Sequence, residues 1–243
     1  GAKLVAAGMT WIEIKRRNLL GRPKISIRDI FSHLKESAVF FLSRIAVSLY
    51  STLNTVLLGV RFSEAALGQY GVANSLTNTC RSMLSPVSDS IYPYLVNRKN
   101  FALVRRILLI LEPMIVAGCV LLWFIAAPVI RIVCGEGYSG AVPVFRAMLP
   151  LIVISLPTYL FGYPVLGALN RVGVANTSVI AGSAFHVAGL LVLHFCGRLD
   201  FISVPLLTFA TEIVVFAIRA GTVAREYSAR KGHRSSERKG DDA

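Results

Sequence analysis

The stretch from residue 68 to residue 94, GQYGVANSLTNTCRSMLSPVSDSIYPY, decides the fold class, because at helical spacing it is polar along one side and apolar elsewhere. Side chains three or four positions apart lie on the same face of an α-helix. The residues on this polar face are Tyr70, Asn74, Asn78, Arg81, Ser85, Asp89 and Tyr92. Such a face does not point at lipid.

Apolar runs on both sides of this stretch indicate that the helix lies in a membrane. Residues 37–60 are apolar apart from a second polar face, and residues 107–133 are apolar almost all round and longer than the roughly 20 residues that one bilayer crossing needs. Of the whole chain, 54% is hydrophobic and 16% charged, and the mean hydropathy is +0.62. We therefore predict an all-α integral membrane protein, a bundle of about six transmembrane helices.

The positions of lysine and arginine predict how the bundle crosses the membrane. Loops on the cytoplasmic side carry the excess of these residues. If the basic connection before residue 37 is cytoplasmic, Arg98, Lys99, Arg171 and the basic tail fall on the same side, and the opposite connections hold few cations. This alternation predicts a cytoplasmic C-terminus. It fits six spans, at about 37–60, 66–96, 107–133, 143–168, 174–196 and 201–219.

These spans divide the chain into three predicted parts. Residues 1–36 are expected to hold the end of a preceding helix and a basic cytoplasmic connection, residues 37–219 the transmembrane bundle, and residues 220–243 a disordered basic tail. Because the chain does not begin with Met and opens on an apolar segment, we expect it to be a fragment.

Other classes of site and partner find no support in the residues. The net charge of +13 is explained by the connections and the tail, and no nucleic-acid-binding motif is present, so we expect no nucleic-acid partner. The four cysteines stand singly, without metal-ligand spacing. We therefore expect no metal, no cofactor and no catalytic residues.

Ionisable residues inside the predicted spans are the first candidates for a functional site, because each costs about 3 kcal/mol to insert at the membrane centre. They are Arg44, Arg81, Asp89 and Glu112. Arg44, Asp89 and Glu112 lie at similar depth, about 8–12 Å from the cytoplasmic ends of their helices. We predict that Arg44 pairs with Asp89 or Glu112, and that Arg81 has no carboxylate and faces a cavity, where a guanidinium binds phosphate. The alternative is that these charges are structural, with Arg81 bonded to helix-end carbonyls.

Uncharged polar residues complete the predicted cavity. Asn54, Asn74, Asn78 and Ser48 can hydrogen-bond to sugar hydroxyls. Equally, such residues join helices to one another in membranes.

The residues also resemble a known family. Residues 50–76, YSTLNTVLLGVRFSEAALGQYGVANSL, and residues 84–96, LSPVSDSIYPYLV, carry an aromatic and an Asn in the first helix, a short loop ending in LGQYG, and two prolines before a basic loop. Together with CGEGYSGAVPVFRAMLP, residues 134–150, they resemble the bacterial polysaccharide (O-antigen type) flippases of the multidrug, oligosaccharidyl-lipid and polysaccharide exporter superfamily.

The resemblance implies one lobe, the C-terminal half, of a two-lobe fold, with an N-terminal helix bundle missing. It implies a non-enzyme that flips an undecaprenyl-pyrophosphate-linked oligosaccharide across the bacterial inner membrane by alternating access. The implied partners are the polyprenyl-pyrophosphate-linked glycan, membrane lipids and a polysaccharide polymerase. A multidrug or cation-coupled exporter of the same superfamily and a membrane-embedded glycan polymerase or acyltransferase are the alternative functions.

Overall fold

The structure, a computed structural model, describes residues 8–13, residue 16 and residues 27–240. The chain divides into two compact units, Gly1–Ala38 and Val39–Ala243, and the second holds all the helices described below except the first part of α2. Much of the expected basic connection, residues 17–26, lies outside the described residues. The helices are α2 (Ile27–Arg61), α3 (Glu64–Ser82), α4 (Ser85–Arg98), α5 (Phe101–Cys134), the short 3-10 helix η1 (Glu136–Tyr138), α6 (Ala141–Leu160), α7 (Tyr163–Ala168), α8 (Val172–Phe195) and α9 (Ser203–Gly240).

The prediction of an all-α integral membrane bundle is confirmed. In the described part of the chain, five segments are helical, long and apolar enough to cross a membrane: Ser37–Arg61, Phe101–Cys134, Ala141–Ala168, Val172–Phe195 and Ser203–Ala229. They correspond to five of the six expected spans. The stretch expected to form the second span, residues 66–96, folds as the pair α3 and α4, neither of which meets that standard of length and apolarity.

The break between α3 and α4 has a local cause at Pro86. Proline has no amide hydrogen, so Pro86 leaves the carbonyl of Ser82 without its usual helical donor. The hydroxyl of Ser85 donates to that carbonyl instead, at 3.0 Å. The amide of Leu84 turns back to the carbonyl of Arg81, so the regular α-helical hydrogen bonding of α3 ends before α4 begins.

The last helix differs from its expected end. The sequence predicts a span that stops near residue 219 and a disordered tail after it, whereas α9 runs from Ser203 to Gly240. The segment after residue 219 is polar, which argued for disorder, but it contains the helix formers Ala, Arg, Glu and Lys and follows a helix that is already nucleated.

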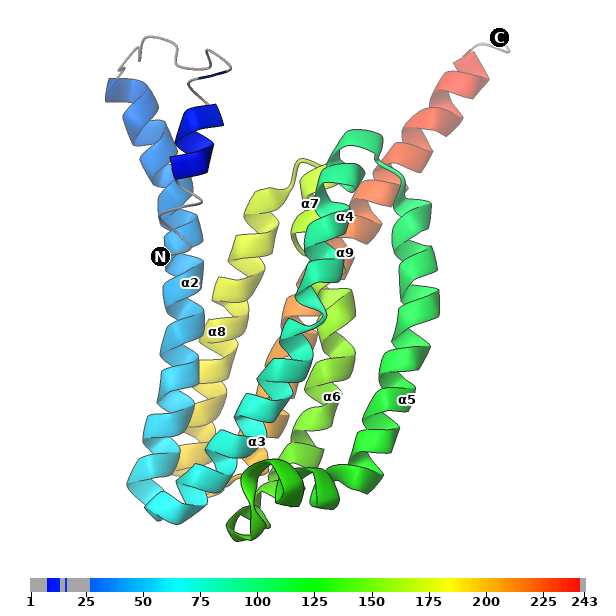
Figure 1. Cartoon of the computed structure of the whole chain (residues 1–243). Helices are drawn as coiled ribbons and strands as arrows, with labels where there is room; N and C mark the ends of the chain where they lie inside the picture. Colours follow the sequence, from blue (N-terminus) through cyan, green and yellow to red (C-terminus); the bar gives the residue numbers. More distant parts are fainter. Residues whose placement is uncertain (1–7, 14–15, 17–26, 241–243) are drawn as a thin grey trace. The chain divides into compact units, whose positions relative to one another are not determined.

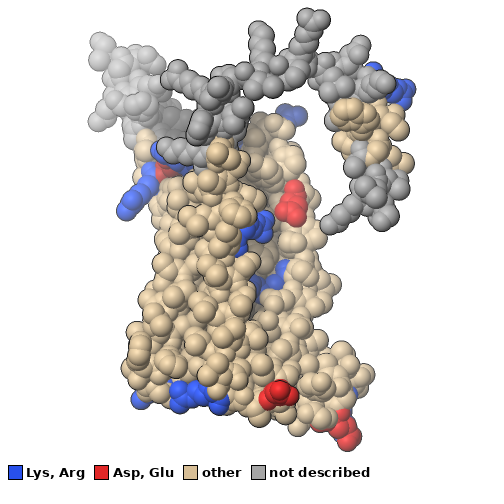
Figure 2. Space-filling view, turned by 90° about the vertical axis from the view of Figure 1, so that its left-hand side faces the viewer, with Lys and Arg blue, Asp and Glu red and all other residues tan. Residues whose placement is uncertain are grey.

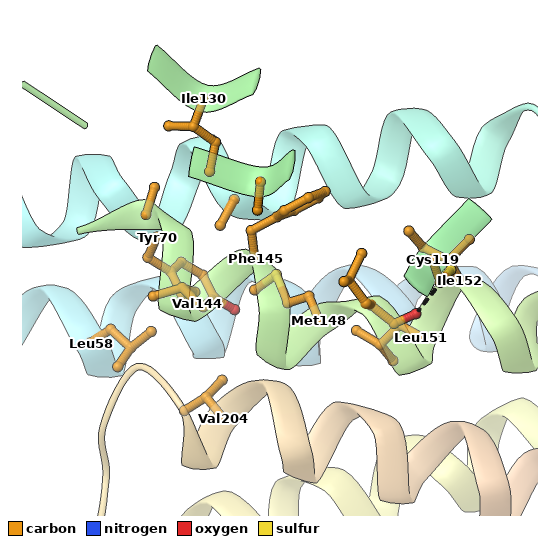
Figure 3. Packing of buried hydrophobic residues seen from close by; sticks show 14 of the residues in the cluster. Leu58, Tyr70, Cys119, Ile130, Val144, Phe145, Met148, Leu151, Ile152 and Val204 are labelled. Atoms are coloured by element: carbon orange, nitrogen blue, oxygen red, sulfur yellow. Dashed lines mark hydrogen bonds between the residues drawn. The ribbon is translucent and has the colours of Figure 1, made fainter. Parts of the chain in front are cut away.

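The core of the bundle is built around α6. Its apolar residues, among them Phe145, Met148 and Leu156, are almost fully buried, and Figure 3 shows Phe145 and Met148 within the cluster of buried side chains. α6 packs against α3, α5 and α9, which surround it in Figure 1. By contrast, the most apolar window of α5 is only 6% buried, so most of the α5 surface is available to lipid.

Small residues bring α8 and α9 together. Cβ atoms added at Gly182 and Gly189 would lie 2.4 Å from side-chain atoms of Val215 and Leu207, respectively. Close backbone approach at small residues is a main source of helix association in membranes, where apolar burial against other helices gains little over lipid contact. The glycines therefore set the spacing of this helix pair.

Candidate functional site

The centre of the bundle holds an ion pair between Arg81 at the end of α3 and Glu212 of α9. The two side chains are 15% and 13% exposed. The Nε atom of Arg81 also donates to Ser155 of α6, at 2.7 Å. One guanidinium thus joins three helices inside an apolar bundle.

This arrangement corrects the prediction for Arg81. The sequence analysis expected Arg81 to lack a carboxylate, and the structure gives it Glu212. The two residues lie 131 positions apart, and nothing in the spacing of the chain reveals that α3 and α9 both pack on α6. The sequence did place an acid, Glu212, in the last apolar span. Because a charged residue inside the membrane usually has a partner, Glu212 was a candidate partner for Arg81.

A second polar cluster, on α2, α8 and α9, surrounds His186. The ring is fully buried; its Nε2 lies 2.8 Å from the Oδ1 atom of Asn54, and its Nδ1 lies 2.9 Å from the Oγ1 atom of Thr211. The ring of Tyr50 packs against it at 4.7 Å between centroids. Asn54, predicted to face a sugar, is 6% exposed and joins α2 to α8 instead, which is the alternative role for such residues.

Arg219 of α9 is a buried cation that the sequence analysis did not single out. It is 7% exposed and donates to the carbonyl of Thr158 at 2.7 Å, to the hydroxyl of Ser178 at 2.9 Å and to the carbonyl of Ala175 at 3.2 Å. Thr158 lies near the C-terminus of α6, where the helix dipole favours positive charge. Uncharged acceptors at a helix end therefore hold this guanidinium, because no described carboxylate lies within ion-pair distance of it.

The predicted pairing of Arg44 is wrong. Among the described residues, neither Asp89 nor Glu112 lies within ion-pair distance of Arg44, whose guanidinium sits over the ring of Phe40 at 5.2 Å. Asp89 is exposed on α4. Equal depth in the membrane does not make two helices neighbours, and α2 is not among the helices that pack closely on α4 or α5 in the described part of the chain.

Glu112 lies on α5, in a cavity of its own. The cavity has a volume of about 500 Å³ and walls formed by apolar residues of α5 and α6, with Phe209 of α9. The Oε2 atom of Glu112 is buried without a hydrogen-bond partner among the described residues. This carboxyl is therefore separate from the ion pair at the centre of the bundle.

The other predicted polar residues form an exposed face on α2 and α3. Arg44, Ser48, Asn74 and Asn78 are exposed, and the amide of Asn78 donates to Asn74 Oδ1 at 3.3 Å. We call these four residues, together with Ser51 and Thr55 of α2, the polar face. In Figure 2, charged side chains gather mainly at the ends of the molecule, and a few lysine or arginine groups interrupt the uncharged middle.

Comparisons with known proteins agree with this architecture. Residues 3–99 match a family model described as "Polysaccharide biosynthesis protein". A putative O-antigen transporter of Escherichia coli strain K12 is 25% identical over 223 residues, which are 89% of this chain and 53% of that protein. A putative O-antigen transporter of Shigella dysenteriae is 27% identical over 75 residues, which are 31% of this chain and 19% of that protein.

The chain thus spans about half the length of the Escherichia coli relative. No solved structure matches the chain. The chain is therefore similar to a family of polysaccharide biosynthesis proteins over residues 3–99 and to a putative O-antigen transporter over most of its own length.

Proposed function

We propose that this chain is part of a transporter that moves a polyprenyl-pyrophosphate-linked oligosaccharide across the bacterial inner membrane. One observation carries the proposal: the polar face of α2 and α3 is exposed although it belongs to a membrane bundle. Polar side chains at membrane depth face a water-filled cavity or another protein in preference to lipid. A cavity beside this face, bounded by further helices of the whole transporter, would receive the polar part of the substrate.

The chemistry of the polar face suits a glycan attached to a pyrophosphate. Arg44 is exposed and has no ion-pair partner among the described residues, and a guanidinium binds phosphate oxygens in a two-pronged manner. Asn74, Asn78 and Ser48 supply donors and acceptors for sugar hydroxyls. We assign the pyrophosphate contact to Arg44.

Arg81 receives a different role in this proposal. Glu212 neutralises the charge of Arg81, and one N–H group of Arg81 donates a hydrogen bond to Ser155. Arg81 is therefore less suited than Arg44 to attract an anion. Because α3, α6 and α9 meet at this ion pair, we propose that it holds the wall behind the polar face. Asp89 is exposed on α4 and receives no role in this proposal.

The orientation follows from the cations. Lys99, Arg171 and the basic end of α9 lie on one side of the spans and are proposed to be cytoplasmic. Transport in this arrangement proceeds by alternating access, in which the polar face is open first to the inside and then to the outside.

The test is Arg44→Ala in the whole transporter, reconstituted in vesicles with a lipid-linked oligosaccharide. A lost charge-assisted contact is expected to lower translocation about tenfold or more, with a smaller loss for Arg44→Lys. The control is Arg131→Ala, which removes a cation that is 70% exposed at the far end of α5. Equal translocation by Arg44→Ala and the control would overturn the assignment of Arg44.

A second candidate function, export of an apolar organic cation, is favoured by the setting of Glu112. A carboxyl whose Oε2 atom has no hydrogen-bond partner among the described residues, in an apolar cavity with Trp123 and Phe124 in its wall, suits such a cation. If the whole protein exports a hydrophobic cation, Glu112→Gln abolishes that export, and the wild type moves no lipid-linked oligosaccharide, this second function replaces the first.

A further inference from the structure

A second and larger cavity lies at the end of the bundle where α4 gives way to α5. Its volume is about 1150 Å³, above the roughly 300–1000 Å³ of most small-molecule sites. α5 forms one wall and residues 220–229 of α9 form another, and Phe161 and Val165 contribute from the region of α6 and α7. The segment that the sequence predicted to be disordered therefore begins as a wall of this cavity.

The charges of the cavity are of one sign. Among the residues that the structure describes, Lys99 and Arg105 are the charged ones that line it, and no acidic residue does. Neither cation has an ion-pair partner among the described residues. Tyr227 brings a phenol, and the remaining lining residues are apolar.

Lys99 is held at its place by the backbone. It ends α4 with a φ of 51°, in the left-handed region, and its amide donates to the carbonyl of Leu95 at 2.8 Å. This turn reverses the chain between α4 and α5, which meet at this end of the bundle (Figure 1). The Lys99 ammonium thus lies near the first turns of α5, close in sequence to Arg105.

The apolar part of the cavity matches the depth of one membrane leaflet. From Phe101 to Leu109 the lining follows α5 over eight residue steps, or about 12 Å. Half of the hydrocarbon core of a bilayer is about 15 Å thick. An acyl chain in this cavity would therefore end near the middle of the membrane, while its headgroup would lie at the level of Lys99.

We propose that this cavity binds an anionic diacyl phospholipid of the cytoplasmic leaflet, with the phosphate at Lys99 and Arg105 and the acyl chains between α5 and α9. Unpaired cations at one end and apolar walls over the depth of a leaflet match both parts of such a lipid. Basic pockets between helices on the cytoplasmic side are sites of this chemical class. The bound lipid fills the space between α5 and α9, so it sets their spacing.

The test measures lipid retained by the purified whole protein in detergent, with native mass spectrometry as the readout and added phosphatidylglycerol or phosphatidylcholine as the probe. The double variant Lys99→Gln/Arg105→Gln is expected to bind phosphatidylglycerol about 30-fold more weakly, at about fivefold for each cation. The matched control, Arg98→Gln/Arg106→Gln, removes the same charge from exposed neighbours that do not line the cavity. Its expected loss is about twofold or less.

Three outcomes would overturn the proposal. The first is equal weakening by both double variants, which would mean that charge alone attracts lipid to this end. The second is retention of phosphatidylcholine as strong as that of phosphatidylglycerol. The third is displacement of phosphatidylglycerol by a polyprenyl phosphate that binds the same cations more tightly. Size-exclusion profiles identify any variant that fails to fold. If the double variant fails to fold, Ala224→Trp replaces it in the test. This substitution fills the cavity without removing charge and is expected to abolish retention of phosphatidylglycerol.

Discussion

The ion pair of Arg81 and Glu212 joins helices that are far apart in the sequence. Both side chains are mostly buried, and a buried charge that loses its partner is far less stable than a neutral pair of similar volume. Its effect on stability is therefore largest when only one of the two residues is changed.

We predict that Glu212→Ala lowers the free energy of unfolding by about 3–5 kcal/mol, because Arg81 is left charged without a counter-ion. The double variant Arg81→Met/Glu212→Leu is expected to recover most of that loss. Thermal unfolding of the purified protein in detergent measures both effects. If the double variant is as unstable as the single variant, the ion pair is not the source of the loss.

The carboxyl of Asp200, in the loop before α9, provides a test by pH. Partial burial raises its pKa, but hydrogen bonds from the backbone amides of Ser203 and Ile202 and an interaction with the Ser203 side chain outweigh this and hold the pKa below its usual 3.8. Ser203 also accepts a hydrogen bond from the amide of Asp200, which completes a capping arrangement.

Because the pKa is lower in the folded state, the ionised carboxyl stabilises the start of α9 above about pH 4. This contribution is lost as the pH falls through the folded-state pKa. The protection factor of amides in the first turns of α9, which corrects the exchange rate for its intrinsic pH dependence, is expected to fall at low pH in the wild type. In Asp200→Ala, the protection factor should be low at every pH, and a fall at low pH that persists in this variant would contradict the role of the carboxyl.

At the scale of elements, the sequence predicted the long apolar helices well and the broken ones poorly. α5 and α8 follow long apolar runs; both ends of α8 and the end of α5 lie within two residues of the expected ones, whereas α5 begins six residues before the expected residue 107. The break between α3 and α4 depends on one missing amide at Pro86, whose effect was not separable from that of prolines tolerated inside helices, such as Pro93 and Pro113.

The candidate site was predictable by residue type but not by pairing. The polar face appears in the sequence as helical periodicity, so Arg44, Asn74 and Asn78 could be found. The partner of Arg81 and the buried environment of Asn54 depend on how α9 and α8 pack, and helical periodicity contains no information on which helices become neighbours.

The contact of α8 with α9 gives a prediction at this scale. At Gly182 an added methyl group would lie 2.4 Å from the side chain of Val215, whereas at Gly173 on the same helix nothing lies within 4 Å. Gly182→Ala is expected to destabilise the protein by about 1–3 kcal/mol through overpacking. Gly173→Ala, the control, should stabilise it slightly or leave it unchanged. Thermal unfolding that does not distinguish the two variants would show that α8 and α9 are not closely packed there.

At the scale of the whole molecule, the five apolar segments and the pair α3–α4 predict which connections share a side of the membrane. Ser139 follows α5, and Arg171 precedes α8 after the α6–α7 segment, so a single cysteine at these positions is expected to react from opposite sides of the membrane. Labelling of intact cells with an impermeant maleimide should reach Ser139→Cys and not Arg171→Cys. Labelling of both positions from outside would contradict the proposed path of the chain.

Transport by this protein requires above all that the polar face of α2 and α3 borders water. In the whole transporter, with the native cysteines replaced, Ser51→Cys and Asn78→Cys report on that face, and Leu109→Cys reports on the apolar surface of α5. The direct measurement is their rate of reaction with a membrane-impermeant thiol reagent in native membranes. We predict rapid labelling at positions 51 and 78 and little labelling at position 109. Equally slow labelling at all three positions would show that the polar face is buried against protein or lipid, and it would exclude the proposed cavity.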